Sequence, residues 1–333
     1  MIVRATGARP TRIDELLPSA LMARLDRLDL RSQKLFAGKL VGERRSKLRG
    51  RSVEFDDYRE YIPGDDIRFI DWNVYGRLDR LFIKLFLEEQ DMSVHVAVDA
   101  SPSMQAGPPG GPSKLLFAQR LAMALGYIGL ANNDRVAVTV FGGPRVERLP
   151  EMRGRRNVQR LGRFLLDTID PTYAVTSGAA APTFTDAMRA VSTTRRGKGV
   201  MVVISDFLLR EGYEQGLRYL AAGLGREAGA GNSFDTYIVQ TLAPGEIDPE
   251  KDGGEGEGGV IGDLRLTDAE TGHAAEVTVT AALVKRYKER LQQYVGGLEA
   301  YCNARSMNHA LLSCDTDIEQ AIFGTFRKHG LLR

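Results

Sequence analysis

The sequence has little cysteine and little histidine, which limits the kinds of site that it can form. Its two cysteines are Cys302 and Cys314, both close to the C-terminal end. So few cysteines exclude a scaffold held by several disulfides and a zinc site made of cysteine pairs. The histidines are scattered along the chain, at His95, His273, His309 and His329. Sparse cysteine is typical of proteins from a reducing compartment.

Long apolar runs are also missing, as is an excess of charge of one sign. No window approaches the roughly 20 apolar residues of a membrane helix, and residues 1–7 lack the apolar centre of a secretory signal. We therefore expect a cytoplasmic protein with no membrane span. Lys and Arg number 45 against 43 Asp and Glu, giving a net charge of +2. This balance gives no general attraction to nucleic acid, and we expect none to bind.

Hydrophobic spacing divides the 333 residues into three parts. In residues 1–40, leucines recur at helical spacing after Ile13, which predicts an amphipathic helix that Pro18 bends or delays. Residues 41–90 begin with a basic run and continue with short aromatic and aliphatic segments, which predicts a small β module. Residues 91–333 alternate strand-like and helical segments, which is typical of a doubly wound, mostly parallel α/β sheet.

The elements of the third part follow from its apolar pattern. The expected strands are 94–98, 136–141, 200–204, 234–239 and 310–312. Helical spacing covers 114–131, 158–169, a segment opening near 185, 213–222 and 283–302. A last helix is expected to open with a capping box of Thr316 and Glu319. A glycine-rich acidic stretch and a β-hairpin form an insert near 252–280.

Oxygen-bearing side chains follow two of the expected strands. Asp99, Ser101 and Ser103 come directly after strand 94–98, Asp206 follows strand 200–204, and Thr185 lies where a helix is expected to open. Ligands of open α/β sheets gather outside the carboxyl ends of the strands, so these side chains should meet. Two carboxylates and three hydroxyls are hard oxygen ligands that suit Mg²⁺ or Mn²⁺.

This pattern resembles the metal-ion-dependent adhesion site of von Willebrand factor type A domains. The resemblance implies that the metal ligands are Asp99, Ser101, Ser103, Thr185 and Asp206. It also implies that an acidic residue of a partner protein fills the open coordination position. The family often has Gly-Gly-Thr in the hydroxyl loop, whereas residues 182–185 are Pro-Thr-Phe-Thr, so Thr183 remains an alternative to Thr185. Serine and aspartate after strands are also common turn and N-cap residues, which is the structural alternative to a metal site.

The segment before the sheet carries a long ordered string of residues. It consists of Gly-Arg-Ser-Val-Glu-Phe at 50–55, Tyr-Arg-Glu-Tyr-Ile-Pro-Gly-Asp-Asp-Ile-Arg at 58–68, Ile-Asp-Trp at 70–72 and Arg-Leu-Asp-Arg-Leu-Phe-Ile-Lys at 77–84. The string resembles the signature of the bacterial domain of unknown function 58 family, whose members join it to a von Willebrand factor type A-like domain. The resemblance runs from about Leu21 to the end. It implies an adaptor or chaperone-like role beside a MoxR-type AAA+ ATPase.

The same segment also has a structural interpretation. Its aromatic and aliphatic residues could form a small core: Phe55, Tyr58, Tyr61, Phe69, Ile70 and Trp72. Its charged residues could form a network of ion pairs and turns: Arg59, Asp65, Asp66, Arg68 and Asp71.

Taken together, these patterns favour a non-enzymatic, metal-dependent protein-interaction module. The sequence contains no nucleophile elbow, Walker motif or dinucleotide fingerprint, and no base, nucleophile and orienting group occur together. A metal-dependent phosphoryl hydrolase is one alternative, because Mg²⁺ can orient phosphate and water. A nucleic-acid-binding protein is another, through the basic residues of 44–51 and 153–156. The oligomeric state is left open.

Overall fold

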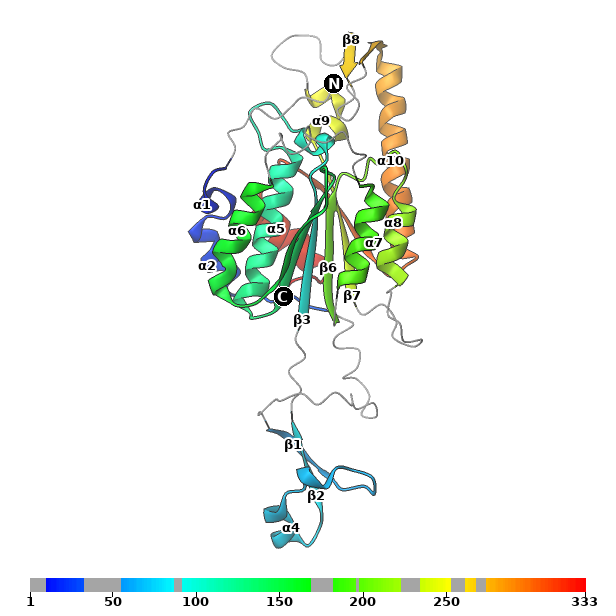
Figure 1. The fold of residues 1–333 in the computed structure, drawn as a ribbon. Coiled ribbons are helices and arrows are strands. Elements are labelled where there is room, and N and C mark those ends of the chain that lie inside the picture. Colours follow the sequence, from blue (N-terminus) through cyan, green and yellow to red (C-terminus); the bar gives the residue numbers. More distant parts are fainter. Residues whose placement is uncertain are drawn as a thin grey trace. The chain divides into compact units, whose positions relative to one another are not determined.

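A six-stranded, mostly parallel sheet forms the centre of the fold (Figure 1). In a computed structural model of the chain, the described residues are 10–32, 55–86, 92–168, 182–195, 198–222, 234–252, 261–267 and 274–333. They belong to two units. The larger unit, Met1–Ala37 with Met92–Arg333, holds this sheet, and the smaller unit, Gly38–Asp91, holds a two-stranded sheet of its own.

The central sheet confirms the predicted α/β class. Its strands are β3 (Met92–Asp99), β4 (Arg135–Phe141), β5 (Glu147–Met152), β6 (Lys198–Ser205), β7 (Phe234–Leu242) and β10 (Asn308–Ser313). Their order is β10-β7-β6-β3-β4-β5, and all neighbours are parallel except β4 and β5. The five parallel strands are those predicted from apolar runs. The edge strand β5 was not predicted.

Helices cover both faces of this sheet (Figure 1). The long ones are α5 (Lys114–Ala131), α6 (Val158–Asp167), α7 (Phe184–Thr194), α8 (Glu214–Ala222) and α10 (Ala281–Asn303). Val94, Val96 and Val98 of β3 pack in the core under α5 and α6, while Ala97 packs in the core under α7, α8 and α10. This alternation follows from the two-residue period of a strand. Within the described residues, every helix is too short or too polar to cross a membrane.

The N-terminal segment differs from the single helix predicted for 1–40. It forms two short helices, α1 (Ile13–Leu16) and α2 (Ser19–Leu25), separated at Pro18. Proline has no backbone N–H and fixes its own φ, so a helix rarely continues through it. Leu30 is buried in an extended segment that forms a bridge with Leu332. The remaining residues of the prediction, 33–40, lie outside the described part of the chain.

The C-terminal helix begins differently from the prediction. The short helix α11 (Ile318–Gln320) leads into a π-helical turn, η6 (Ala321–Phe326). The predicted capping box of Thr316 and Glu319 is wrong, because Asp317 is the N-cap and its Oδ1 accepts a hydrogen bond from Glu319 N at 2.7 Å. The Glu319 carboxylate instead pairs with Arg24 of α2. The side chain therefore joins two segments of the unit and does not cap its own helix.

The insert near 252–280 contains the predicted hairpin, formed by β8 (Gly262–Thr267) and β9 (Ala274–Val279). Most of the glycine-rich stretch before it, 253–260, lies outside the described residues. A short helix, α9 (Pro244–Ile247), follows β7 and precedes this stretch.

The smaller unit pairs β1 (Phe55–Glu60) with β2 (Phe82–Phe86) and carries α4 (Trp72–Leu78) between them. The predicted small core is confirmed at Ile70 but wrong for Tyr58, Phe69 and Trp72, whose rings are exposed. Trp72 is 64% exposed and Phe69 is 45% exposed, while Ile70 and Ile83 are buried. Within the described residues of this unit, one seven-residue helix and one pair of antiparallel strands offer too little surface to bury rings of this size.

The predicted polar network of this unit is present. Arg59 pairs with Asp65 at 2.5 Å, and Arg68 pairs with Asp66 at 2.6 Å. Asp71 caps α4 by accepting hydrogen bonds from Asn73 N and Val74 N. Its carboxylate also binds Lys84 and the Tyr58 hydroxyl, each at 2.9 Å. The Lys84 hydrogen bond is the largest of the effects that hold the pKa of Asp71 at about 2.

Candidate metal centre

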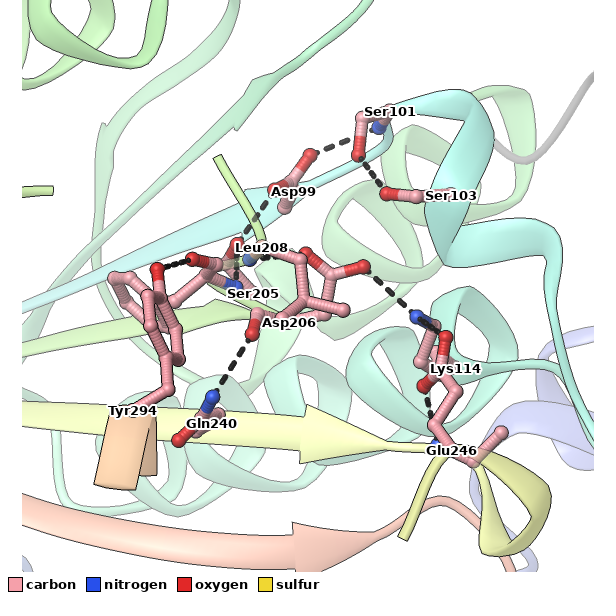
Figure 2. A network of polar contacts seen from close by, with 12 residues as sticks. Asp99, Ser101, Ser103, Lys114, Ser205, Asp206, Leu208, Gln240, Glu246 and Tyr294 are labelled. Atoms are coloured by element: carbon pink, nitrogen blue, oxygen red, sulfur yellow. Dashed lines mark hydrogen bonds and ion pairs between the residues drawn. The ribbon is translucent and has the colours of Figure 1, made fainter. Parts of the chain in front are cut away.

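The predicted ligands Asp99 and Asp206 meet at the carboxyl edge of the central sheet (Figure 2). Asp99 is the last residue of β3, and Asp206 directly follows β6. Because β3 and β6 pair in parallel, with Val98 opposite Ile204, both strands end at the same edge. Each aspartate is only 1% exposed. The site therefore places two carboxylates in a nearly dry environment.

Hydrogen bonds to both carboxylate oxygens hold the Asp99 side chain in place. Oδ1 accepts a hydrogen bond from Ser101 N at 2.8 Å, and Oδ2 accepts one from the Ser205 hydroxyl at 2.6 Å. Gly142 lies against this carboxylate with a φ of +83°, and a Cβ at Gly142 would lie 2.5 Å from Asp99 Oδ1. Burial, with a further contribution from the charge of Asp206, raises the pKa of Asp99 to about 6. Ser205 and Gly142 were not among the predicted site residues.

Ser101 and Ser103 present their hydroxyls to each other beside Asp99 (Figure 2). The two Oγ atoms are 3.0 Å apart. Pro102 opens a short 3-10 turn, Pro102–Gln105, directly after Ser101. This turn brings the alternate serines to the same side of the loop, as their spacing predicted. Asp99, Ser101 and Ser103 therefore form one contiguous set of oxygens.

Asp206 is fixed by its own loop and by α10. Its Oδ1 accepts a hydrogen bond from Leu208 N at 3.1 Å, and its carbonyl accepts one from Gln240 Nε2 at 3.1 Å. The next residue, Phe207, is fully buried with a left-handed φ of 56°. This backbone conformation is costly for a bulky residue. The Tyr294 hydroxyl donates to the Phe207 carbonyl at 2.5 Å and holds the turn in place.

Lys114 is a site residue that the sequence analysis missed. Its Nζ donates to Asp206 Oδ2 at 2.8 Å and to Glu246 Oε1 at 2.6 Å, and its side chain is completely buried. Burial acts to lower the pKa of Lys114, but the charges of Asp206 and Glu246 outweigh it and the pKa is raised. Lys114 is the first residue of α5, where the helix dipole disfavours a cation. This unfavourable placement of a lysine at a helix start was the one feature of the sequence that could have indicated a role for Lys114.

The network contains more negative than positive charge. Lys114 Nζ binds the carboxylates of Asp206 and Glu246, and the charge of Asp206 also acts on the carboxylate of Asp99. Three carboxylates thus lie in this network with one ammonium group. A buried charge without a counter-ion is costly, so this set of residues suits a cation. In the described residues, no group of three or more histidine, cysteine or carboxylate side chains is placed to hold a metal ion. A metal bound here would therefore depend on the serine and threonine hydroxyls.

The two candidate threonines differ in what their hydroxyls do. Thr183 is the N-cap of α7, and its Oγ1 accepts from Asp186 N at 3.1 Å and donates to Asp186 Oδ2 at 2.8 Å. The helix thus opens at Phe184, one residue earlier than predicted. The Thr185 hydroxyl makes no hydrogen bond in the described part of the chain. Of the two hydroxyls, that of Thr185 is therefore the one available to bind a metal ion. No described contact joins it to Asp99 or Asp206.

The fold and this edge of the sheet define an α/β protein with a buried, acidic, hydroxyl-rich centre. A family model described as "Protein of unknown function DUF58" matches residues 57–225, about half of the chain. The chain belongs to this family. The matched range contains every predicted metal ligand.

Two mycobacterial proteins are similar over a longer stretch. They are the uncharacterized protein Rv1480 of Mycobacterium tuberculosis and the uncharacterized protein Mb1516 of Mycobacterium bovis. Each is 25% identical over 264 residues, which is 79% of this chain and 75% of the relative. The similarity therefore extends well beyond the range of the family model.

Proposed function

We propose that this protein is a metal-dependent protein-interaction module with a von Willebrand factor type A-like domain. Mg²⁺ or Mn²⁺ would be held by Asp99, Ser101, Ser103, Thr185 and Asp206. The observation that carries this proposal is the pair of buried aspartates at adjacent strand ends, Asp99 and Asp206. The ammonium group of Lys114 binds Asp206 and Glu246, whereas Asp99 has only hydrogen-bond donors. A divalent cation would balance the remaining charge.

The mode of partner recognition follows from the types of ligand. Hydroxyl ligands carry no charge, so an ion held by hydroxyls and two carboxylates stays electrophilic and attracts a further carboxylate. Within the chain, Asp99 is fixed by Ser101 N and Ser205 Oγ, and Asp206 is fixed by Leu208 N and Lys114. These contacts prepare both aspartates before a partner arrives. An acidic side chain from a partner protein would complete the site.

The partner class rests on the family resemblance. We propose that the protein acts in the cytoplasm as an adaptor or chaperone-like factor of a MoxR-type AAA+ ATPase, engaging the ATPase or its client. The site residues do not form a set of nucleophile, base and orienting group, so an interaction role is preferred to hydrolysis.

A pull-down with the recombinant ATPase, in Mg²⁺ and in EDTA, tests this function. Recovery should require Mg²⁺ and should be lost in Ser101→Ala, which removes a ligand hydroxyl from a solvent-accessible turn. Thr280→Val is the matched control, because it removes a hydroxyl that caps α10 and is not among the candidate ligands. Equal recovery in Mg²⁺ and EDTA would show that any association uses another surface.

A further inference from the structure

An arginine-rich groove lies at the other end of the larger unit from the metal centre. It has a volume of about 520 Å³ and lies between α2, the C-terminal helical turn and Arg333. Leu28 borders the groove, and its carbonyl accepts a hydrogen bond from Asn132 Nδ2, in the turn between α5 and β4. This places the groove at the amino edge of the parallel strands, whereas Asp99 ends β3 at the carboxyl edge.

The groove combines an apolar floor with a cationic rim. Ala23, Leu28 and Phe323 supply the apolar surface, and the rim consists of Arg24, Arg27, Arg327 and Arg333. Arg24 is already engaged, because it pairs with Glu319 and lies over the Phe323 ring at 4.8 Å. Stacking on the ring holds its guanidinium group at the edge of the apolar surface.

The side chains of the other three arginines have no partner among the described residues. Arg27, Arg327 and Arg333 make no hydrogen bond or ion pair through their side chains in the described part of the chain. The nearby carboxylates are committed elsewhere. Asp26 accepts from the Tyr127 hydroxyl at 2.7 Å and pairs with Arg155, while Asp29 accepts from Asn132. The groove therefore gathers three arginine side chains without an ion-pair partner among the described residues.

Helix ends account for only two of the four arginines in this cluster. Arg24 lies in the last turn of α2 and Arg327 directly follows η6, so both stabilise the negative end of a helix. Arg27 and Arg333 lie outside helices. Local secondary structure gives no reason for Arg27 and Arg333 to lie beside the same apolar surface. This arrangement points to a ligand.

We propose that this groove binds an acidic peptide segment of a protein partner. Guanidinium groups pair with carboxylates through two parallel hydrogen bonds, and Arg27, Arg327 and Arg333 could each make such a pair. The floor of Leu28 and Phe323 would take an aliphatic or aromatic side chain of the same peptide. Because α2 and η6 meet the groove with their C-terminal ends, neither supplies the helix N-terminus that commonly binds phosphate. The attraction for an anion comes from the arginine side chains. The proposal is independent of metal binding.

Fluorescence anisotropy with a labelled peptide, Glu-Glu-Leu-Glu-Glu-Phe-Glu-Glu, tests the proposal on the full chain. EDTA is present throughout, so that the metal centre does not contribute. We expect saturable binding that weakens about tenfold or more in Arg27→Gln/Arg327→Gln, since two charged pairs are lost. The control, Arg218→Gln/Arg290→Gln, removes the same charge from exposed arginines of α8 and α10 on the opposite face of the sheet, and it should bind as wild type does.

Two further probes test the chemistry of the ligand. Replacing the leucine and phenylalanine of the peptide by glycine should weaken binding severalfold, because the apolar floor then loses its contact. A single-stranded oligonucleotide of equal charge should bind more weakly than the peptide. The proposal is overturned if the peptide does not bind wild-type protein, if both double variants lose the same affinity, or if the oligonucleotide binds more tightly.

Discussion

Lys114 Nζ lies 2.8 Å from Asp206 Oδ2, and both side chains are almost completely buried. The lysine gives Asp206 an internal counter-ion, while Asp99 has only hydrogen-bond donors. Any metal ion at the site must therefore share Asp206 with an ammonium group. Lys114 belongs to α5 and Glu246, its other partner, to α9, so the same ion-pair cluster also ties three segments of the larger unit together.

Lys114→Met should therefore separate structural and metal-binding effects. Removing one partner of a buried ion pair leaves an uncompensated charge, so unfolding free energy in EDTA should fall by about 3–5 kcal/mol. Mg²⁺ affinity should rise about tenfold or more, because the competing ammonium charge is gone. Chemical denaturation and calorimetry measure the two effects. Lys288→Met is the control: Lys288 pairs with Asp248 and Glu250 but is partly exposed, so its loss should change stability little. Wild-type stability of Lys114→Met in EDTA would contradict this account.

Gly142→Ala should disturb Asp99 directly. A Cβ there would lie 2.5 Å from Asp99 Oδ1 and 2.6 Å from Ser101 N, so the carboxylate or the turn must shift. We expect loss of metal binding together with reduced thermal stability. Gly110→Ala is the control, because Gly110 also has a positive φ, +70°, but has nothing within 4 Å of an added Cβ. It should cost about 1–2 kcal/mol of stability and leave metal affinity unchanged. Equal metal affinity in both variants would mean that the position of Asp99 is unimportant.

The two threonine variants should differ in which quantity they change, metal affinity or stability. Thr185→Val should weaken metal binding at little cost to stability, because its hydroxyl makes no hydrogen bond within the described residues. Thr183→Val should lower stability by about 1 kcal/mol through loss of the N-cap and leave metal affinity unchanged. Calorimetric titration and thermal unfolding distinguish them. The reverse pattern would assign the ligand to Thr183.

Stability should also depend on pH through His95. Burial, together with the charges of Arg148 and Arg195, lowers the pKa of His95 to about 3. The folded chain then binds fewer protons at His95 than the unfolded chain does, so stability falls as pH drops below about 6.5 and continues to fall towards pH 3. Each pH unit in that window should cost about 1.4 kcal/mol. Denaturation series from pH 7 to pH 5 should show a shallower slope for His95→Gln than for wild type. An unchanged slope would exclude His95 as the cause.

The sequence predicted those parts of the fold in which both faces of a strand are buried. All eight residues of β3 are buried, and such strands appear as continuous apolar runs. The edge strand β5 was not predicted because only Leu149 and Met152 of its residues are buried, and they do not form an apolar run. The helix predicted for 1–40 was too long, because buried leucines such as Leu30 continue the spacing after the helix has ended.

The candidate centre was predictable only in part. Asp99, Ser101 and Ser103 are neighbours in sequence, and adjacent parallel strands bring Asp206 to the same edge. Lys114 could not be placed from spacing, because its partners lie 92 and 132 residues away. Trp72 was predicted to lie in a small core because its ring is large and apolar. It is exposed because few described residues surround α4.

Calorimetric titration of Mg²⁺ into the full chain and its Asp99→Asn variant tests the central claim most directly. The substitution removes the charge of the carboxylate and keeps its size, so circular dichroism should show an unchanged fold. Asp263→Asn, on the exposed hairpin strand β8, is the matched control. The account predicts that wild type and Asp263→Asn bind one ion with equal affinity and that Asp99→Asn shows no measurable binding. Equal binding in all three proteins, or none in wild type, would contradict it.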